Sequence, residues 1–168
     1  MSTGKGRFTL TLDATPMGTL RLWSDGQSLT AIDFREENAS GETRPDLPVL
    51  QQAVAELREY FAGTREEFTV ALAPTGTPFQ QRVWSELLRI PFGTTISYGE
   101  LARRIGQPTA SRAVGLANGQ NPLPIIVPCH RVIGSTGKLT GYGGGIENKR
   151  WLLQHESEGR WRKATSAS

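Results

Sequence analysis

The sequence contains a single cysteine, Cys129, among its 168 residues. One thiol excludes an internal disulfide framework, because disulfides need paired cysteines. There are only two histidines, His130 and His155, which leaves too few ligands for a zinc site of the usual cysteine and histidine kind. We therefore expect no metal. Cys129 is then either a small buried apolar side chain or a reactive group.

Long apolar runs are absent as well. No segment approaches the roughly 20 apolar residues of a membrane helix, and the first residues, MSTGKGRFTLTL, lack the apolar run of a secretory signal. We therefore expect a cytoplasmic protein without membrane association. The apolar content of 37% is ordinary for one compact domain or two small ones.

The charges are distributed unevenly along the chain. Residues 1–75 hold seven basic and 11 acidic side chains, a net charge of −4, whereas residues 76–168 hold 12 and five, a net charge of +7. The basic half is the one that carries Cys129. This asymmetry favours a polyanionic partner for that half, although a solvated basic face is the ordinary alternative.

Residues 1–75 have the pattern of an α+β domain. The runs FTLTL and GTLRLW alternate apolar and polar residues around a turn at Pro16–Gly18, and a third run follows at Ala31–Phe34, which predicts antiparallel strands. A polar loop, REENASGETRPDLP, leads to apolar residues at helical spacing over 49–61. A further strand is expected at Phe68–Leu72. The apolar stripes here are most simply core.

Residues 76–168 are predicted to be mostly helical and to contain a helix-turn-helix. Thr77–Gln80 is a capping box with proline at the first helical position, and Ser97–Glu100 is a second capping box that opens a short helix. The next segment, ASRAVGLANG, consists almost wholly of small residues, with Arg112 as the long side chain. Small residues let a helix approach a nucleic-acid groove closely, although helical hairpins of small residues also arise merely to pack well.

In the segment NPLPIIVPCHRVIG, three prolines before Cys129 restrict the backbone and bring the cysteine to a fixed position. In extended chain the side chains of Cys129 and His130 point to opposite faces, so either the chain turns here or a water lies between thiol and imidazole. On the last helix, Glu156 lies between leucines on an apolar arc. It either reaches solvent near the helix end or accepts a hydrogen bond from His130, which would complete a relay that activates the thiol.

The motif PCHRV, preceded by NPLPIIV and followed by GYGGG and KRWLLQHE, resembles the signature of the O(6)-alkylguanine-DNA alkyltransferases, also called methylated-DNA-protein-cysteine methyltransferases. The resemblance extends from about Thr77 to Glu156. It implies an α+β protein of two domains. Residues 1–75 would form a ribonuclease H-like scaffold with an antiparallel sheet, and residues 76–168 a mostly helical, winged-helix-like domain that binds DNA and transfers the alkyl group.

The resemblance also implies roles for individual residues. Cys129 matches the alkyl acceptor, His130 the base that acts through a bound water, and Glu156 the carboxylate that orients it. Asn121 matches the residue that ties the helix-turn-helix to the active-site segment. Tyr142 matches a position that lines the guanine pocket, and the departing guanine needs a proton or a hydrogen-bond donor, a role open to Tyr142. The DNA-binding positions are Arg112, which fills the gap left by an extruded base, together with Tyr98, Ala113 and Gly115. The positions expected to line or adjoin the guanine pocket are Val127, Gly143, Gly144 and Lys149.

The implied function is direct-reversal DNA repair. The alkyl group of O(6)-alkylguanine, and to a lesser extent of O(4)-alkylthymine, in duplex DNA would move irreversibly to Cys129 after base flipping, once per protein molecule and without a cofactor. We expect a monomer, and the sequence leaves cooperative binding to DNA open. A cysteine hydrolase would use the same residue types, but Pro128, just before the cysteine, lacks a backbone N–H that could serve in an oxyanion hole. A lesion-marking module without catalysis is disfavoured because such relatives lack the cysteine.

Overall fold

The computed structural model describes residues 6–34, 41–137, 142 and 145–166. Within it the chain divides into two compact units, Met1–Thr75 and Gly76–Ser168. Among the described residues, no helix combines the length and the apolar character needed to cross a membrane.

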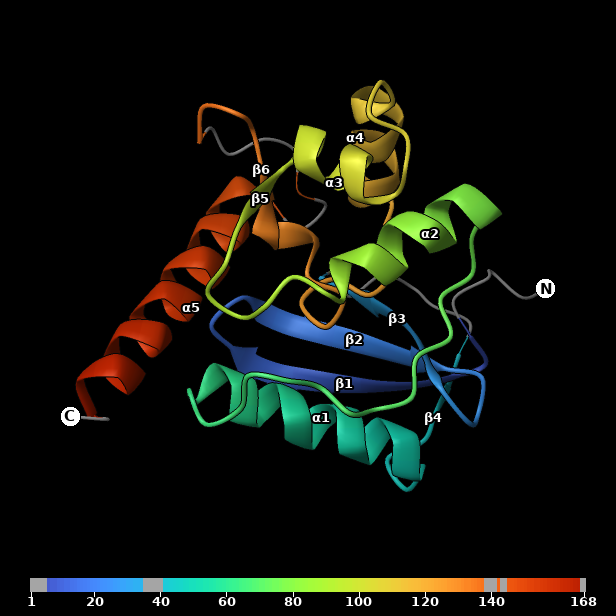
Figure 1. The fold of residues 1–168 in the computed structure, drawn as a ribbon. Helices are drawn as coiled ribbons and strands as arrows, with labels where there is room; N and C mark the ends of the chain where they lie inside the picture. The colour runs from blue at the N-terminus through green and yellow to red at the C-terminus, as the bar shows by residue number, and fades with distance from the viewer. Residues whose placement is uncertain (1–5, 35–40, 138–141, 143–144, 167–168) are drawn as a thin grey trace. The chain divides into compact units, whose positions relative to one another are not determined.

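The first unit is a four-stranded sheet covered by one helix (Figure 1). The strands are β1 (Phe8–Thr15), β2 (Gly18–Ser24), β3 (Leu29–Asp33) and β4 (Glu42–Thr43), in the order β3-β2-β1-β4. The first three pair antiparallel, while the short β4 runs parallel to β1. Helix α1 (Pro48–Phe61) packs on β1 and β2. This is the ribonuclease H-like α+β arrangement expected from the sequence.

The core of this unit follows from the strand and helix periods. Strands place alternate side chains on one face, and the helix places every third or fourth on one stripe. The fully buried side chains that meet there are Leu20, Leu22, Leu29, Leu50, Ala53, Leu57 and Tyr60. The turn expected at Pro16–Gly18 joins β1 to β2, where Thr15 pairs with Gly18.

The strand predicted at Phe68–Leu72 is wrong, because only one isolated bridge forms there, between Leu72 and Leu29. The carboxylate of Glu56 on α1 accepts hydrogen bonds from the backbone N–H groups of Thr69 and Val70, at 2.9 and 3.1 Å. These donors are therefore unavailable for a sheet ladder. The polar stretch predicted as a loop contains the two residues of β4.

The second unit is mostly helical. Its helices are α2 (Pro78–Leu87), α3 (Tyr98–Arg104), α4 (Ser111–Gly119) and α5 (Ile146–Ser166). The short strands β5 (Ile96–Ser97) and β6 (Val132–Ile133) pair in parallel, and a 3-10 turn, η1 (Cys129–Arg131), precedes β6. Helices α2, α3 and α4 pack against one another, and α5 packs against η1. Figure 1 shows α3 and α4 as the adjacent pair of the predicted helix-turn-helix.

The two predicted capping boxes differ in the structure. At α2 both halves form, since Thr77 Oγ1 accepts from the backbone of Gln80 and the Gln80 side chain accepts from the backbone of Thr77. At α3 only Ser97 Oγ accepts from the Glu100 backbone, at 3.0 Å. The Glu100 carboxylate turns to Arg103 and Arg104 instead. Two cations on the same helix thus compete successfully with the N-cap amide.

Candidate active site

The backbone turns at the single cysteine. Cys129 opens η1, where Arg131 N donates to Pro128 O at 3.0 Å and Cys129 N donates to Val127 O at 2.7 Å. The chain therefore turns at Cys129 and His130, as one of the two possibilities for this segment required, and the turn leaves room for the other, a water between thiol and imidazole, to hold as well. The thiol is free and its residue only 5% exposed. The turn therefore presents a buried sulfur from a fixed backbone.

His130 and Glu156 form a fully buried pair. His130 Nε2 lies 2.7 Å from Glu156 Oε2, and the two side chains are 0% and 1% exposed. Glu156 thus does not reach solvent, and it lies in the middle of α5 and not near the end of that helix. With Nε2–H donated to the carboxylate, a neutral imidazole carries its lone pair on Nδ1. Nδ1 is buried and has no hydrogen-bond partner among the described residues, so it is the atom that can accept a proton.

Arg131 is a third member of this group, and the sequence analysis did not single it out. Its Nε and Nη2 donate to the two oxygens of Glu156 at 2.8 and 2.9 Å, and Nη1 donates to Ile90 O at 2.7 Å. The guanidinium also lies 5.8 Å from the ring centroid of Phe92. The sequence does contain a signal for this role, because Arg131 stands among the apolar residues of NPLPIIVPCHRVIG. A cation between buried neighbours needs an anionic partner.

These contacts set the protonation states of the pair. Burial alone would raise the pKa of Glu156, but His130 and the Arg131 guanidinium more than offset this and hold that pKa far below its ordinary value. Burial lowers the pKa of His130, and the adjacent carboxylate only partly opposes the effect. At neutral pH the resting site therefore contains an ionised carboxylate and a neutral imidazole.

The thiol itself is protonated at rest. Burial raises the pKa of Cys129 to about 11, although the nearby Asn121 amide and the Lys149 ammonium act in the opposite direction. Desolvation dominates in the resting site, so the site contains a thiol and not a thiolate. A relay that activates this thiol would have to remove its proton during the reaction.

Tyr142 and Lys149 lie in the same electrostatic environment. The pKa of Tyr142 is raised well above its ordinary value, first by burial, then by Cys129 once its thiol is ionised, and by the carboxylate of Glu156. Its hydroxyl therefore stays protonated and can donate. Lys149 is 0% exposed, and its Nζ donates to Val132 O at 2.8 Å. Burial lowers the pKa of this ammonium.

Two asparagines connect the end of α4 to the segment before the cysteine. Asn121 Nδ2 donates to Val127 O at 2.8 Å, and Asn121 Oδ1 accepts from Leu123 N at 2.9 Å. Val127, proposed to line the pocket, is itself buried. Asn118, which the sequence analysis did not single out, donates to Cys129 O at 3.3 Å.

The four DNA-binding candidates lie on α3 and α4, apart from the carboxylate group. Arg112 and Ala113 are exposed on α4, and within the described part of the chain Arg112 makes no hydrogen bond or ion pair. Tyr98 opens α3, and its ring lies beside Gly115, where an added Cβ would meet ring atoms at 3.7 and 3.8 Å. Gly143 and Gly144, the other two pocket candidates, lie outside the described residues.

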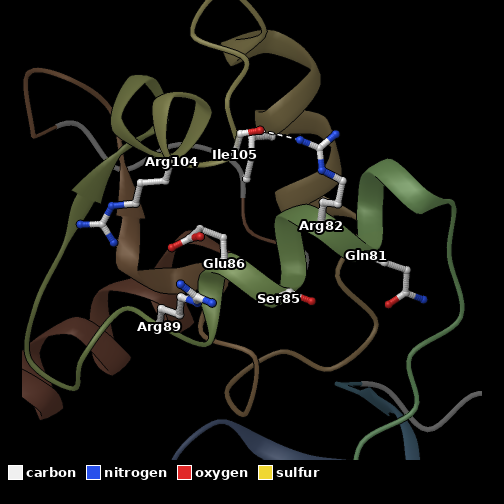
Figure 2. Close-up of a pocket in the computed structure, with 7 residues that line it drawn as sticks. All are labelled: Gln81, Arg82, Ser85, Glu86, Arg89, Arg104 and Ile105. Atoms are coloured by element: carbon white, nitrogen blue, oxygen red, sulfur yellow. Dashed lines mark hydrogen bonds between the residues drawn. The ribbon is translucent and has the colours of Figure 1, made fainter.

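A separate cavity of about 400 Å³ opens between α2 and α3 (Figure 2). Its lining residues are Gln81, Arg82, Ser85, Glu86, Arg89, Arg104 and Ile105. Arg82 donates to the carbonyl of Ile105 across it. None of these residues belongs to the candidate active site. In the described ranges, no group of three acidic, histidine or cysteine side chains is placed to hold a metal ion.

Comparisons with known proteins assign both units. Residues 8–74 match the model of the 6-O-methylguanine DNA methyltransferase ribonuclease-like domain, and residues 78–158 that of the DNA binding domain. The methylated-DNA-protein-cysteine methyltransferase of Mycobacterium tuberculosis is 55% identical over 149 residues, which cover 87% of this chain and 90% of the relative. That of Methanosarcina acetivorans is 48% identical over 147 residues, covering 84% and 94%.

A solved structure agrees with these relatives. The crystal structure of Mycobacterium tuberculosis OGT in complex with DNA superposes with a TM-score of 0.83 at 53% identity and covers 90% of this chain and 94% of that one. The similarity therefore extends over both units and over nearly the full length of each protein.

Proposed function

The chain belongs to the 6-O-methylguanine DNA methyltransferase family, and on that premise we propose that it removes alkyl groups from O(6)-alkylguanine in duplex DNA by transferring them to Cys129. The activity is that of a methylated-DNA-protein-cysteine methyltransferase, a direct-reversal DNA repair reaction. The observation that carries the assignment to these residues is the buried cysteine followed by a neutral imidazole hydrogen-bonded to Glu156.

The proposed reaction is a single displacement. The proton of the Cys129 thiol passes, through a bridging water, to the free Nδ1 of His130, while Glu156 stabilises the imidazolium that forms. Sulfur attacks the alkyl carbon, the bond from that carbon to O6 breaks, and its electron pair goes to guanine. Tyr142 donates a hydrogen bond to the departing base, which takes up a proton in place of its alkyl group. His130 gives up the proton that it took from the thiol, so that one proton passes from Cys129 to guanine overall. The buried Arg131 keeps Glu156 ionised throughout.

The product is a thioether on Cys129. A thioether has no carbonyl that water can attack, so no step in this site restores the thiol. Each molecule therefore reacts once, and the transfer needs no cofactor. The protein acts as a monomer in the cytoplasm, and O(4)-alkylthymine is a secondary substrate.

The substrate base must leave the duplex to reach this site. The alkyl group of a stacked base cannot reach a buried thiol, and extrusion of the base costs a few kcal/mol. Arg112, exposed on α4 and without a protein partner among the described residues, is positioned to offset part of that cost by filling the vacancy. Ala113 and Gly115 keep α4 thin, and Tyr98 lies against it. Val127, Gly143, Gly144 and Lys149 would line or support the guanine pocket.

The test is a mass measurement after mixing the protein with a duplex that carries one O(6)-methylguanine, with no cofactor added. We expect one added methyl per protein, on the peptide that contains Cys129, and no further increase with time. Cys129→Ala should still bind the duplex and gain no methyl. Methyl transfer by Cys129→Ala would overturn the assignment, and repeated turnover would argue for a hydrolase.

A further inference from the structure

The side chain of Asn118 has an unusual position in the second unit. It lies on α4, the helix that carries Arg112, yet it is only 2% exposed and points into the protein. Its Nδ2 donates to the backbone carbonyl of Cys129 at 3.3 Å. The DNA-facing helix thus makes a side-chain contact with the backbone of the nucleophile itself.

The carbonyl that Asn118 holds is in the peptide unit between the nucleophile and its base. The same oxygen also accepts from the backbone N–H of Val132, which closes the 3-10 turn. A carbonyl oxygen has two lone pairs, and here both are used. The plane of the Cys129–His130 peptide is therefore fixed from two sides, and with it the directions in which the thiol and the imidazole leave the backbone.

The other half of the Asn118 amide is not satisfied. Its Oδ1 is buried and has no hydrogen-bond partner within the part of the chain that the structure describes. A buried acceptor without a partner lowers stability, and an apolar side chain of similar shape would avoid that loss. Since Val132 N–H would still satisfy the Cys129 carbonyl, the fold gains little from an amide at this position.

We propose that Asn118 is a positioning residue for the transfer reaction, which holds the Cys129–His130 peptide in the orientation that aligns thiol, base and alkyl carbon. This rests on the proposed function. Misplacement of reacting groups by a fraction of their contact distance slows reactions by one to two orders of magnitude. Asn118 acts on the transfer step and not on DNA binding, because its side chain faces away from solvent.

The experiment compares Asn118→Leu and Asn118→Ala with the unaltered protein. The rate constant and half-saturation concentration are measured with a methylated duplex and with free O(6)-benzylguanine, together with the final number of alkyl groups per protein. For Asn118→Leu we expect a maximal rate lower by about tenfold or more on both substrates. Duplex affinity should change less than twofold, the final stoichiometry should stay at one, and the melting temperature should not fall.

A buried valine on the same helix supplies the control. Val114→Ala removes two methyl groups from a 0% exposed side chain, and Val114 is not among the residues proposed for catalysis or DNA binding. It should lower the melting temperature and leave the rate of the folded molecules unchanged, because an unfolded fraction reduces the amount alkylated and not the rate constant. Asn118 variants that behave like Val114→Ala, or that react within twofold of the unaltered protein, would overturn the inference. An unaltered protein that accepts no alkyl group would instead refute the proposed function.

Discussion

At the scale of single residues, the thiol and the imidazole of the candidate site are both uncharged at rest. The thiol of Cys129 is protonated, the imidazole of His130 is neutral, and the charges of Glu156 and Arg131 cancel each other. In the proposed reaction, proton transfer from sulfur to His130 creates a thiolate and an imidazolium next to a carboxylate already ionised. Burial, which opposes a resting thiolate, also makes that thiolate poorly solvated and therefore reactive when it forms.

This arrangement predicts a nearly flat pH profile between about pH 7 and 9. The pKa of His130 lies below its ordinary value and that of Cys129 is about 11. Across this range the thiol therefore stays protonated and the imidazole stays neutral. Below it the rate should fall as His130 becomes protonated and ceases to be a base. The rate constant with free O(6)-benzylguanine, measured by rapid quenching, tests this. A tenfold rise per pH unit between 7 and 9 would show that a freely ionised thiolate reacts instead.

Removal of the Arg131 guanidinium should lower the free energy of unfolding, because the Glu156 carboxylate would then be buried without this cation. Arg131→Met removes the guanidinium that binds both oxygens of Glu156, and the loss of one member of a buried ion pair typically costs about 3–5 kcal/mol. We expect the free energy of unfolding in urea to fall by that amount, and transfer to slow because the pKa of Glu156 rises. Arg150→Met is the matched control, since Arg150 pairs with Glu147 at the surface, with 56% and 85% of the side chains exposed. Equal effects of the two substitutions would contradict the proposed role of Arg131 in stabilising the buried Glu156 carboxylate.

At the scale of elements, local sequence determines most of the helices and strands that carry the site. Pro78 after the capping residue Thr77 and the small residues of ASRAVGLANG were sufficient to predict α2 and α4. The wrongly predicted strand reflects a long-range contact, whereas the incomplete capping box of α3 reflects the local pairs of Glu100 with Arg103 and Arg104. Glu56 diverts the backbone donors of the expected strand at Phe68–Leu72, a bond across 13 residues that no local pattern shows.

The residues of the candidate site could be predicted only in part. Cys129, His130 and Glu156 follow from the PCHRV motif and from a carboxylate on an apolar arc. Arg131 and Asn118 were missed, because their roles depend on which atoms they reach: the oxygens of Glu156, 25 residues further along the chain, and the carbonyl of Cys129. Such contacts are set by the packing of α4 and α5 around η1, which the sequence does not display.

The exposed Arg112 of α4 should contribute to reaction with duplex DNA but not to the chemical step. Arg112→Ala removes the exposed side chain proposed to stack in the vacated position, so extrusion of the base becomes more costly. We expect the reaction with a methylated duplex to slow at least tenfold, the effect of about 1.4 kcal/mol, while the reaction with free O(6)-benzylguanine keeps its rate. The ratio of the two rate constants is the measurement. Equal losses on both substrates would mean that Arg112 serves the fold or the pocket.

At the scale of the whole molecule, the division of charge coincides with the division into units. Residues 76–168 carry a net charge of +7, and residues 1–75 a net charge of −4. All the proposed catalytic and DNA-binding residues lie in the basic unit. A duplex is a dense polyanion, so the acidic unit is poorly suited to contact it, and phosphate contacts should come from the arginines and lysines of the second unit.

Duplex binding should therefore weaken steeply with salt. Each neutralised phosphate contributes about −0.9 to the slope of log affinity against log salt concentration, so three or four contacts give a slope of roughly −3. Between 50 and 200 mM salt the affinity should then fall by more than about tenfold, which fluorescence anisotropy of a labelled duplex with Cys129→Ala would measure. The reaction of the unaltered protein with uncharged O(6)-benzylguanine is the control and should hardly respond. A slope near zero for the duplex would show that the basic unit does not bind phosphates, and would assign its charge to a solvated surface.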